Sequence, residues 1–150
     1  MGLDVTRERV IPAPPDQVAA YAMDWRHDHE WTQGIRRAEL TREASAGGFG
    51  LGAQVTRTAY FLGKRIDYVL EIVGYDPPTL LDMKSVAGPM PMHVTYRFEP
   101  HPDGALASIR VRGDASAYYR IAGPVMGLMV GRNLAKDLRD LRRHMTGGRG

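Results

Sequence analysis

Apolar and polar residues alternate along much of the chain, and this pattern predicts half-buried β-strands. Residues 65–75 show it clearly, with Ile66, Tyr68 and Leu70 on one face and acidic residues on the other. The same pattern predicts further strands at residues 3–11, 35–43, 53–61, 80–86, 92–99 and 105–115. Turns rich in Gly, Pro and Asp separate the later strands, so we expect hairpin connections and an antiparallel sheet with one dry face.

Other stretches have helical patterns. One short helix is expected from Pro15 onward and another within residues 24–31. A long helix is expected at residues 117–145, where charged residues separate apolar positions at helical spacing. These apolar positions are Leu134, Leu138, Leu141 and Met145. Residues 121–130 are apolar nearly all round, and we therefore expect this half of the helix to be enclosed.

A sheet with one apolar face needs a cover, and the long C-terminal helix is the only expected element large enough to supply it. The pattern therefore predicts an α+β helix-grip fold. A curved antiparallel sheet of about seven strands wraps around the helix, with two short helices after the first strand. A chain of 150 residues suits a single domain over residues 1–150, with residues 146–150 frayed.

Composition changes this picture little. The chain is 43% hydrophobic and 25% charged, as in ordinary globular proteins, and it has no cysteine for a disulfide or a thiolate site. The net charge is +3, but the basic residues are scattered singly or in pairs, so we expect no nucleic-acid partner. No apolar run is long enough for a membrane span, which predicts a cytoplasmic protein without stable membrane insertion.

The long helix carries three glycines in nine positions, at Gly123, Gly127 and Gly131. Each costs about 1 kcal/mol relative to alanine inside a helix, so the three together need a reason. They leave room for a ligand, or they allow close approach to the sheet or a kink at Pro124. The sequence leaves these alternatives open.

Three segments carry a resemblance to a known superfamily. They are residues 11–31 with their proline-initiated helix, residues 50–86, and residues 96–111 ahead of the terminal helix. Together they resemble the START-like or Bet v 1-like helix-grip superfamily (SRPBCC), and specifically its polyketide cyclase/dehydratase-like family. The resemblance implies a deep cavity between the concave sheet and the long helix. It does not imply one function, because this superfamily includes lipid carriers, hormone receptors and aromatase/cyclases.

Within such a cavity, inward-facing apolar residues would contact the ligand. Methionine adapts to irregular shapes and recurs at permissive binding surfaces, although it is also common core filler. The apolar candidates for ligand binding are Trp31, Met83, Met92, Val125, Met126 and Met129. In the family that the chain resembles, the segment around Trp31 closes one end of the cavity.

Polar side chains with inward parity are the other candidates. The ligand-binding set includes Arg57, Tyr68, Ser85, Tyr96, Tyr118 and Asn133. Buried tyrosine hydroxyls normally find a partner, and an inward arginine fixes a carboxylate or polarises an enol oxygen. A β-bulge near Arg57 would instead turn that side chain to water, and the sequence does not decide between the two.

We predict no metal ion and no cofactor. The run at residues 27–30, His-Asp-His-Glu, looks like a metal motif, but two histidines two positions apart face different sides of a helix. We interpret it as a solvated helix face. No nucleophile elbow, phosphate loop or dinucleotide fingerprint is present in the sequence.

These observations favour a binding protein over an enzyme. The first hypothesis is that a hydrophobic or aromatic small molecule, of polyketide, isoprenoid or lipid type, occupies the cavity of a monomer or homodimer. The alternative is a polyketide cyclase/dehydratase-like enzyme that orients a poly-ketone for aldol cyclisation and dehydration, with Arg57, Tyr68 or Tyr96 stabilising an enolate. No histidine or carboxylate has clear inward parity, so the sequence offers no placed general base. A third hypothesis, docking of a protein partner on the basic helix face, ranks last.

Overall fold

The computed structural model describes residues 2–114 and 116–147. Its strands are β1 (Leu3–Ile11), β2 (Ile35–Arg42), β3 (Gln54–Phe61), β4 (Lys64–Asp76), β5 (Leu80–Ala87), β6 (Met92–His101) and β7 (Gly104–Gly113). Its helices are α1 (Pro15–Ala22), a 3₁₀ turn η1 (Trp25–His27), α2 (Asp28–Trp31), α3 (Ser116–Tyr119) and α4 (Gly123–Met145). The expected strands and short helices are all present, with ends that move by a few residues.

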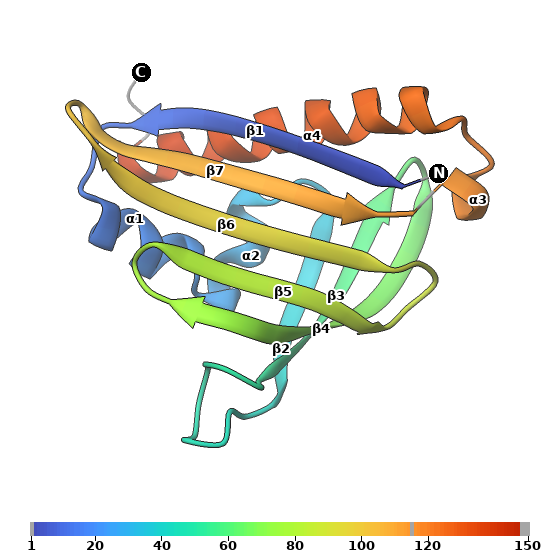
Figure 1. Cartoon of the computed structure of the whole chain (residues 1–150), viewed down its shortest axis with the longest axis horizontal. Helices are drawn as coiled ribbons and strands as arrows, with labels where there is room; N and C mark the ends of the chain where they lie inside the picture. Colours follow the sequence, from blue (N-terminus) through green and yellow to red (C-terminus); the bar gives the residue numbers. More distant parts are fainter. Residues whose placement is uncertain (1, 115, 148–150) are drawn as a thin grey trace.

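The strands form one seven-stranded antiparallel sheet in the order β1-β7-β6-β5-β4-β3-β2. The sheet curves so that β1 and β2, distant along the sheet, come round towards the same helix (Figure 1). Helices α1 and α2 lie at one end of the molecule and α3 at the other, with α4 running between them (Figure 1). The helix-grip fold predicted from the alternation pattern is confirmed.

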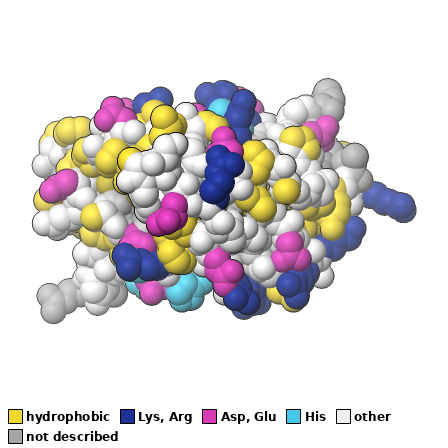
Figure 2. All heavy atoms as spheres, turned by 90° about the horizontal axis from the view of Figure 1, so that it is seen from below, with side chains coloured by type: hydrophobic (Ala, Val, Ile, Leu, Met, Phe, Trp, Pro, Cys, Tyr) yellow, Lys and Arg dark blue, Asp and Glu magenta, His cyan; other side chains and the backbone are white. Residues whose placement is uncertain are grey.

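The core fills the space between the concave face of the sheet and the helices. Every second residue of the central strands points inward, and Leu70, Ile72 and Phe98 are fully buried there. From α4, Leu134, Leu138 and Leu141 are buried against them, as the helical spacing predicts. On the face shown in Figure 2, acidic and basic side chains are interspersed among apolar ones, and neither sign covers the whole face.

The terminal helix differs from the expected one in two ways. It is not continuous from residue 117, because the chain breaks at Arg120, whose φ of 56° is incompatible with a right-handed helix. Pro124 then sits in the first turn of α4, where proline needs no hydrogen-bond partner. The apolar first half is not enclosed either, since Val125 is 46% and Leu128 is 60% exposed. The apolar residues of this half therefore include exposed ones, and the expectation that the half is enclosed is wrong.

The expected fraying of residues 146–150 is only partly within the described residues, because residues 148–150 lie outside them. Thr146 caps α4, and its backbone N–H donates to the Arg142 carbonyl at 2.9 Å.

Two of the three helix glycines, Gly127 and Gly131, face β1 rather than an open cavity. A Cβ added at Gly127 would lie 3.8 Å from Leu3 and 3.9 Å from Val5, and one added at Gly131 would collide with the Arg7 guanidinium. Glycine at these two positions therefore allows α4 to lie close against the edge strand. Of the two alternatives that the sequence leaves open, the contacts favour close approach.

Replacing Gly127 with alanine should stabilise the fold. The added methyl group meets Leu3 and Val5 at ordinary contact distances, and alanine is better than glycine in a helix by about 1 kcal/mol. We expect the Tm, followed by circular dichroism, to rise by about 3 °C. Gly131→Ala is the matched control and should gain less, because its Cβ displaces Arg7. A Tm that falls for Gly127→Ala would show that the helix needs the space.

Candidate functional site

A pocket of about 150 Å³ lies between the inner face of the sheet and α4. Its sheet side consists mainly of apolar residues from β2, β3 and β4, from the segment before β6 and from the start of β6, namely Ile35, Ala59, Phe61, Ile66, Tyr68, Met90 and Met92. Its helix side is made by Val130, Asn133, Leu134 and Asp137 of α4 and by Tyr119 of α3. The pocket therefore has an apolar lining with few polar groups, as is usual for small-molecule sites.

Strand register brings the polar side chains of β3 and β4 together. Arg57 on β3 is paired with Tyr68 on β4, so both side chains emerge on the same inner face. Arg57 is 4% exposed and Tyr68 is 8% exposed. No bulge turns Arg57 outward, because the β3–β4 pairing is regular along the whole of β3. Arg57 thus faces the interior.

Arg57 is held by a buried carboxylate. Its Nε and Nη2 atoms donate to Oδ2 of Asp28 at 3.1 and 2.9 Å, and Nη2 also lies 3.4 Å from the Tyr96 hydroxyl. Asp28 comes from the first turn of α2 and is 3% exposed. A space of only about 10 Å³ adjoins this cluster, lined among others by Met83, so the ion pair is nearly sealed from the main pocket.

Burial shapes the protonation of this cluster. Desolvation raises the pKa of Asp28, and Arg57 only partly offsets that effect. Desolvation opposes the charge of Arg57, yet Asp28 and the two tyrosines hold the pKa of Arg57 above its usual value. Desolvation also raises the pKa of Tyr68, and it raises that of Tyr96 to about 12. At neutral pH both phenols are therefore neutral hydrogen-bond donors.

Asp137 is a second buried carboxylate, and it lines the main pocket. It is 4% exposed, and its Oδ1 accepts a hydrogen bond from the Gln33 backbone N–H at 2.7 Å. Desolvation raises the pKa of Asp137 to about 7, with Asp140 adding to the rise and Gln33 and Arg57 opposing it. A carboxyl group with this pKa exchanges a proton near neutral pH, which is the property of a general acid or base.

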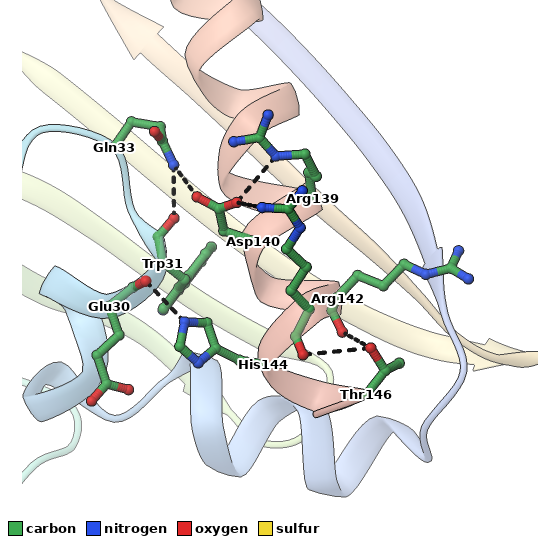
Figure 3. Close-up of polar contacts among 9 residues, drawn as sticks. Glu30, Trp31, Gln33, Arg139, Asp140, Arg142, His144 and Thr146 are labelled. Atoms are coloured by element: carbon green, nitrogen blue, oxygen red, sulfur yellow. Dashed lines mark hydrogen bonds and ion pairs between the residues drawn. The ribbon is translucent and has the colours of Figure 1, made fainter. Parts of the chain in front are cut away.

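The segment after α2 positions Asp137. The Gln33 side chain donates to Asp140 at 2.7 Å and to the Trp31 carbonyl at 3.3 Å, which ties this segment to α4 (Figure 3). His144 lies 3.0 Å from the Glu30 carbonyl and adds a second link one turn further along α4 (Figure 3). Gly34 follows with a φ of 80°, and a Cβ there would collide with the Tyr60 carbonyl. Only glycine permits this close turn into β2.

Two hydroxyl oxygens in the pocket wall lack a partner among the described residues. They are Oγ1 of Thr32 and the hydroxyl of Tyr119, and both atoms are buried. Thr32 directly precedes Gln33, whose backbone N–H donates to Asp137, so the Thr32 hydroxyl lies at the same end of the pocket as Asp137. The Tyr119 ring packs edge-on against Phe61, with ring centroids 5.2 Å apart. Unpaired buried hydroxyls are costly, and they favour a polar partner.

The structure distributes the sequence-predicted site residues among several environments. Tyr68, Met92 and Asn133 line the main pocket, whereas Arg57, Met83 and Tyr96 surround the sealed ion pair. Trp31 and Met126 are buried in the core, with the Trp31 and Tyr96 rings 5.5 Å apart.

The remaining predicted residues lie elsewhere. Ser85 accepts a hydrogen bond from the Met92 backbone at 2.8 Å, Tyr118 lies under Lys64, and Met129 is half-buried. Val125 is exposed and faces neither pocket.

Sequence reasoning missed both buried carboxylates. The interpretation of residues 27–30 as a solvated face is wrong for Asp28, and the expectation that no carboxylate points inward is wrong for Asp137. Helical spacing carried a signal in each case. Asp137 is three residues after Leu134, and Asp28 is three before Trp31, so each shares a face with a buried residue.

In the part of the chain that the structure describes, no group of His, Asp or Glu side chains is arranged to hold a metal ion. None of the described helices is long and apolar enough to cross a membrane.

Solved structures with the same architecture define the class of this fold. A protein from Thermus thermophilus superposes with a TM-score of 0.79 at 18% identity, covering 98% of this chain and 99% of that one. A START superfamily protein from Mycobacterium smegmatis has a TM-score of 0.79 at 12% identity, covering 97% of both chains. The Zhui aromatase/cyclase from Streptomyces sp. R1128 has a TM-score of 0.78 at 13% identity, covering 97% and 94%. At these identities the likeness shows a shared START-like helix-grip fold.

The sequence itself identifies the family. Residues 3–146 match the family described as polyketide cyclase / dehydrase and lipid transport, and the chain belongs to that family. None of the curated proteins matches the sequence. The resemblance inferred from residues 11–31, 50–86 and 96–111 is therefore confirmed at the level of family and fold.

Proposed function

We propose that this protein binds a hydrophobic or aromatic small molecule, of polyketide, isoprenoid or lipid type, in the pocket between the sheet and α4. The pocket itself is the main support, because its walls are largely apolar and carry a limited set of polar side chains, among them Thr32, Tyr68, Arg112, Tyr119, Asn133 and Asp137. A ligand larger than about 150 Å³ would extend beyond this space unless α3 or α4 moves away from the sheet. The family description and the fold of its START neighbour support the same function.

Filling the pocket should abolish binding. Ala59 lies on its floor and is 5% exposed, so a phenylalanine there would occupy the space that a ligand needs. We expect wild-type protein to retain members of a panel of aromatic, isoprenoid and fatty-acyl compounds in native mass spectrometry, and Ala59→Phe to lose them. Ala87→Phe makes the same change at an exposed strand position and should bind as wild type does. Failure of the wild-type protein to bind any compound would reject the proposal.

A second candidate is a polyketide cyclase/dehydratase-like enzyme, and Asp137 is the observation that favours it. Its carboxylate can remove an acidic proton between two ketones, while the Tyr68 hydroxyl donates to the enolate oxygen. Arg57 interacts with Tyr68 and lowers its pKa against the effect of burial, so it acts through the phenol. If this function is correct, Asp137→Asn keeps poly-ketone binding but loses turnover.

The predictions of a cytoplasmic location, of a monomer or homodimer and of no nucleic-acid partner go with this proposal. Each fits a small carrier or catalyst whose ligand enters an internal pocket.

A further inference from the structure

We propose that the pocket selects a ligand with a single ring that carries a hydroxyl group, held between Asp137 and the unpaired hydroxyls of the pocket wall. This inference rests on the proposed function, which it narrows from a broad class of hydrophobic molecules to a size and a polar group.

The size follows from the volume. A cavity of about 150 Å³ lined by apolar side chains accommodates a molecule the size of benzene. Sites for larger ligands have volumes of roughly 300–1,000 Å³. Ala59, Ile66 and Leu134 are all buried in the walls, and widening the pocket would separate α4 from the sheet. One ring fits within the described space, whereas a fused multi-ring molecule would extend beyond it.

The polar group follows from the atoms that lack partners. The hydroxyls of Thr32 and Tyr119 are buried without a partner among the described residues, and each can donate one hydrogen bond. At the Thr32 end, Asp137 offers carboxylate oxygens, of which Oδ1 already accepts from Gln33. A complementary ligand atom must therefore accept from a hydroxyl and donate to a carboxylate at once. A hydroxyl group does both.

Other polar groups fit this site less well. A ketone oxygen accepts but cannot donate, so it adds no hydrogen bond to the one that the Asp137 carboxylate accepts from Gln33. A ligand carboxylate would place a second negative charge beside Asp137. Arg112 is the arginine of the pocket lining; its Nη2 atom already lies 3.0 Å from Nδ1 of His93, and Nε is its only buried nitrogen without a partner among the described residues. A ligand without oxygen leaves both orphan hydroxyls unpaired. The site thus discriminates between ligands by the pocket hydroxyl and carboxylate groups that each ligand leaves without a hydrogen bond.

Phenol and toluene provide a direct test, because they have nearly the same shape and differ by a hydroxyl in place of a methyl group. Titration calorimetry of the full chain at pH 8 should show phenol binding about 10- to 100-fold more tightly than toluene. Benzoate and 2-naphthol, which add a charge and a second ring, should bind more weakly than phenol.

Variants assign the preference to named atoms. Thr32→Val replaces a hydroxyl with a methyl group, Tyr119→Phe removes a hydroxyl and Asp137→Asn removes the charge, so each should reduce the preference for phenol over toluene several-fold. Thr41→Val, at an exposed position, and Tyr118→Phe, next to the pocket residue, are the matched controls and should keep it. A rise in the Tm of a variant on addition of phenol reports binding even where the variant is less stable than wild type.

The outcomes separate this inference from the proposed function. Equal affinity for phenol and toluene would overturn the hydroxyl preference and leave hydrophobic binding in place. Tighter binding of 2-naphthol than of phenol would overturn the single-ring limit. If none of the four probes binds but a larger member of the panel does, the inference fails and the function stands. If nothing binds, both are rejected.

Discussion

Replacing Arg57 with methionine should lower the free energy of unfolding by about 3–5 kcal/mol, because Asp28 would be left as an unpaired carboxyl in the core. Both side chains are at least 95% buried, and two hydrogen bonds of 3.1 and 2.9 Å join them. Urea-induced unfolding, followed by the fluorescence of Trp31 and Trp25, measures the loss. This change also removes the neighbour that the Tyr96 hydroxyl has at 3.4 Å.

The exposed pair of Arg110 and Asp4 is the matched control. Its side chains are 46% and 54% exposed and lie 2.7 Å apart, so solvent screens their attraction and Arg110→Met should have a much smaller effect on stability than Arg57→Met. A double replacement, Arg57→Met with Asp28→Leu, should recover most of the lost stability, because no buried charge remains. Equal losses for Arg57→Met and Arg110→Met would contradict the assignment of a buried, paired arginine.

The alternation of apolar residues was sufficient to predict the sheet, because strand faces have a period of two that burial on one side enforces. It also predicted the buried face of α4 from Leu134 to Leu141. It did not predict the break at Arg120 or the exposure of Val125 and Leu128. A periodic pattern records which residues can be buried, whereas the partner surface decides which ones are. In the first half of α4, Gly127 lies against Leu3 and Val5 of the edge strand β1.

The candidate site was predictable on the strands and less so on the helices. Parity placed Tyr68 and Tyr96 on the inner face and left Arg57 open between that face and water, and all three are buried on the inner face. Asp28 and Asp137 were missed because acidic residues on a helix among other charges are usually solvated. Their burial depends on long-range partners, which are Arg57 at 29 residues' separation for Asp28 and Gln33 at 104 for Asp137. Such pairs are set by the tertiary fold, so helical spacing can mark a shared buried face but does not identify the partner.

Asp137 should make the stability of this protein fall as the pH rises towards neutrality. Its pKa is raised by burial to about 7, so the folded state holds a proton that the unfolded chain has already released above about pH 4. The stabilising contribution is full at lower pH and is lost as the pH rises through about 7. The loss attributable to this group is about 4 kcal/mol as an upper bound.

Comparison with Asp137→Asn isolates this effect from all other titrating groups. The asparagine oxygen can still accept from the Gln33 N–H, but it carries no charge to desolvate. Urea unfolding of both proteins between pH 4.5 and 8 should show wild type losing stability relative to the variant, with the difference levelling off above pH 8. Asp103→Asn removes a carboxylate whose side chain is 81% exposed, and it controls for the loss of a charge without burial. Parallel pH profiles for wild type and Asp137→Asn would mean that Asp137 is ionised at no cost. Asp137 could then not serve as the proton acceptor of an enzyme at neutral pH. It would also have no cost of burying its charge for a ligand hydroxyl to offset.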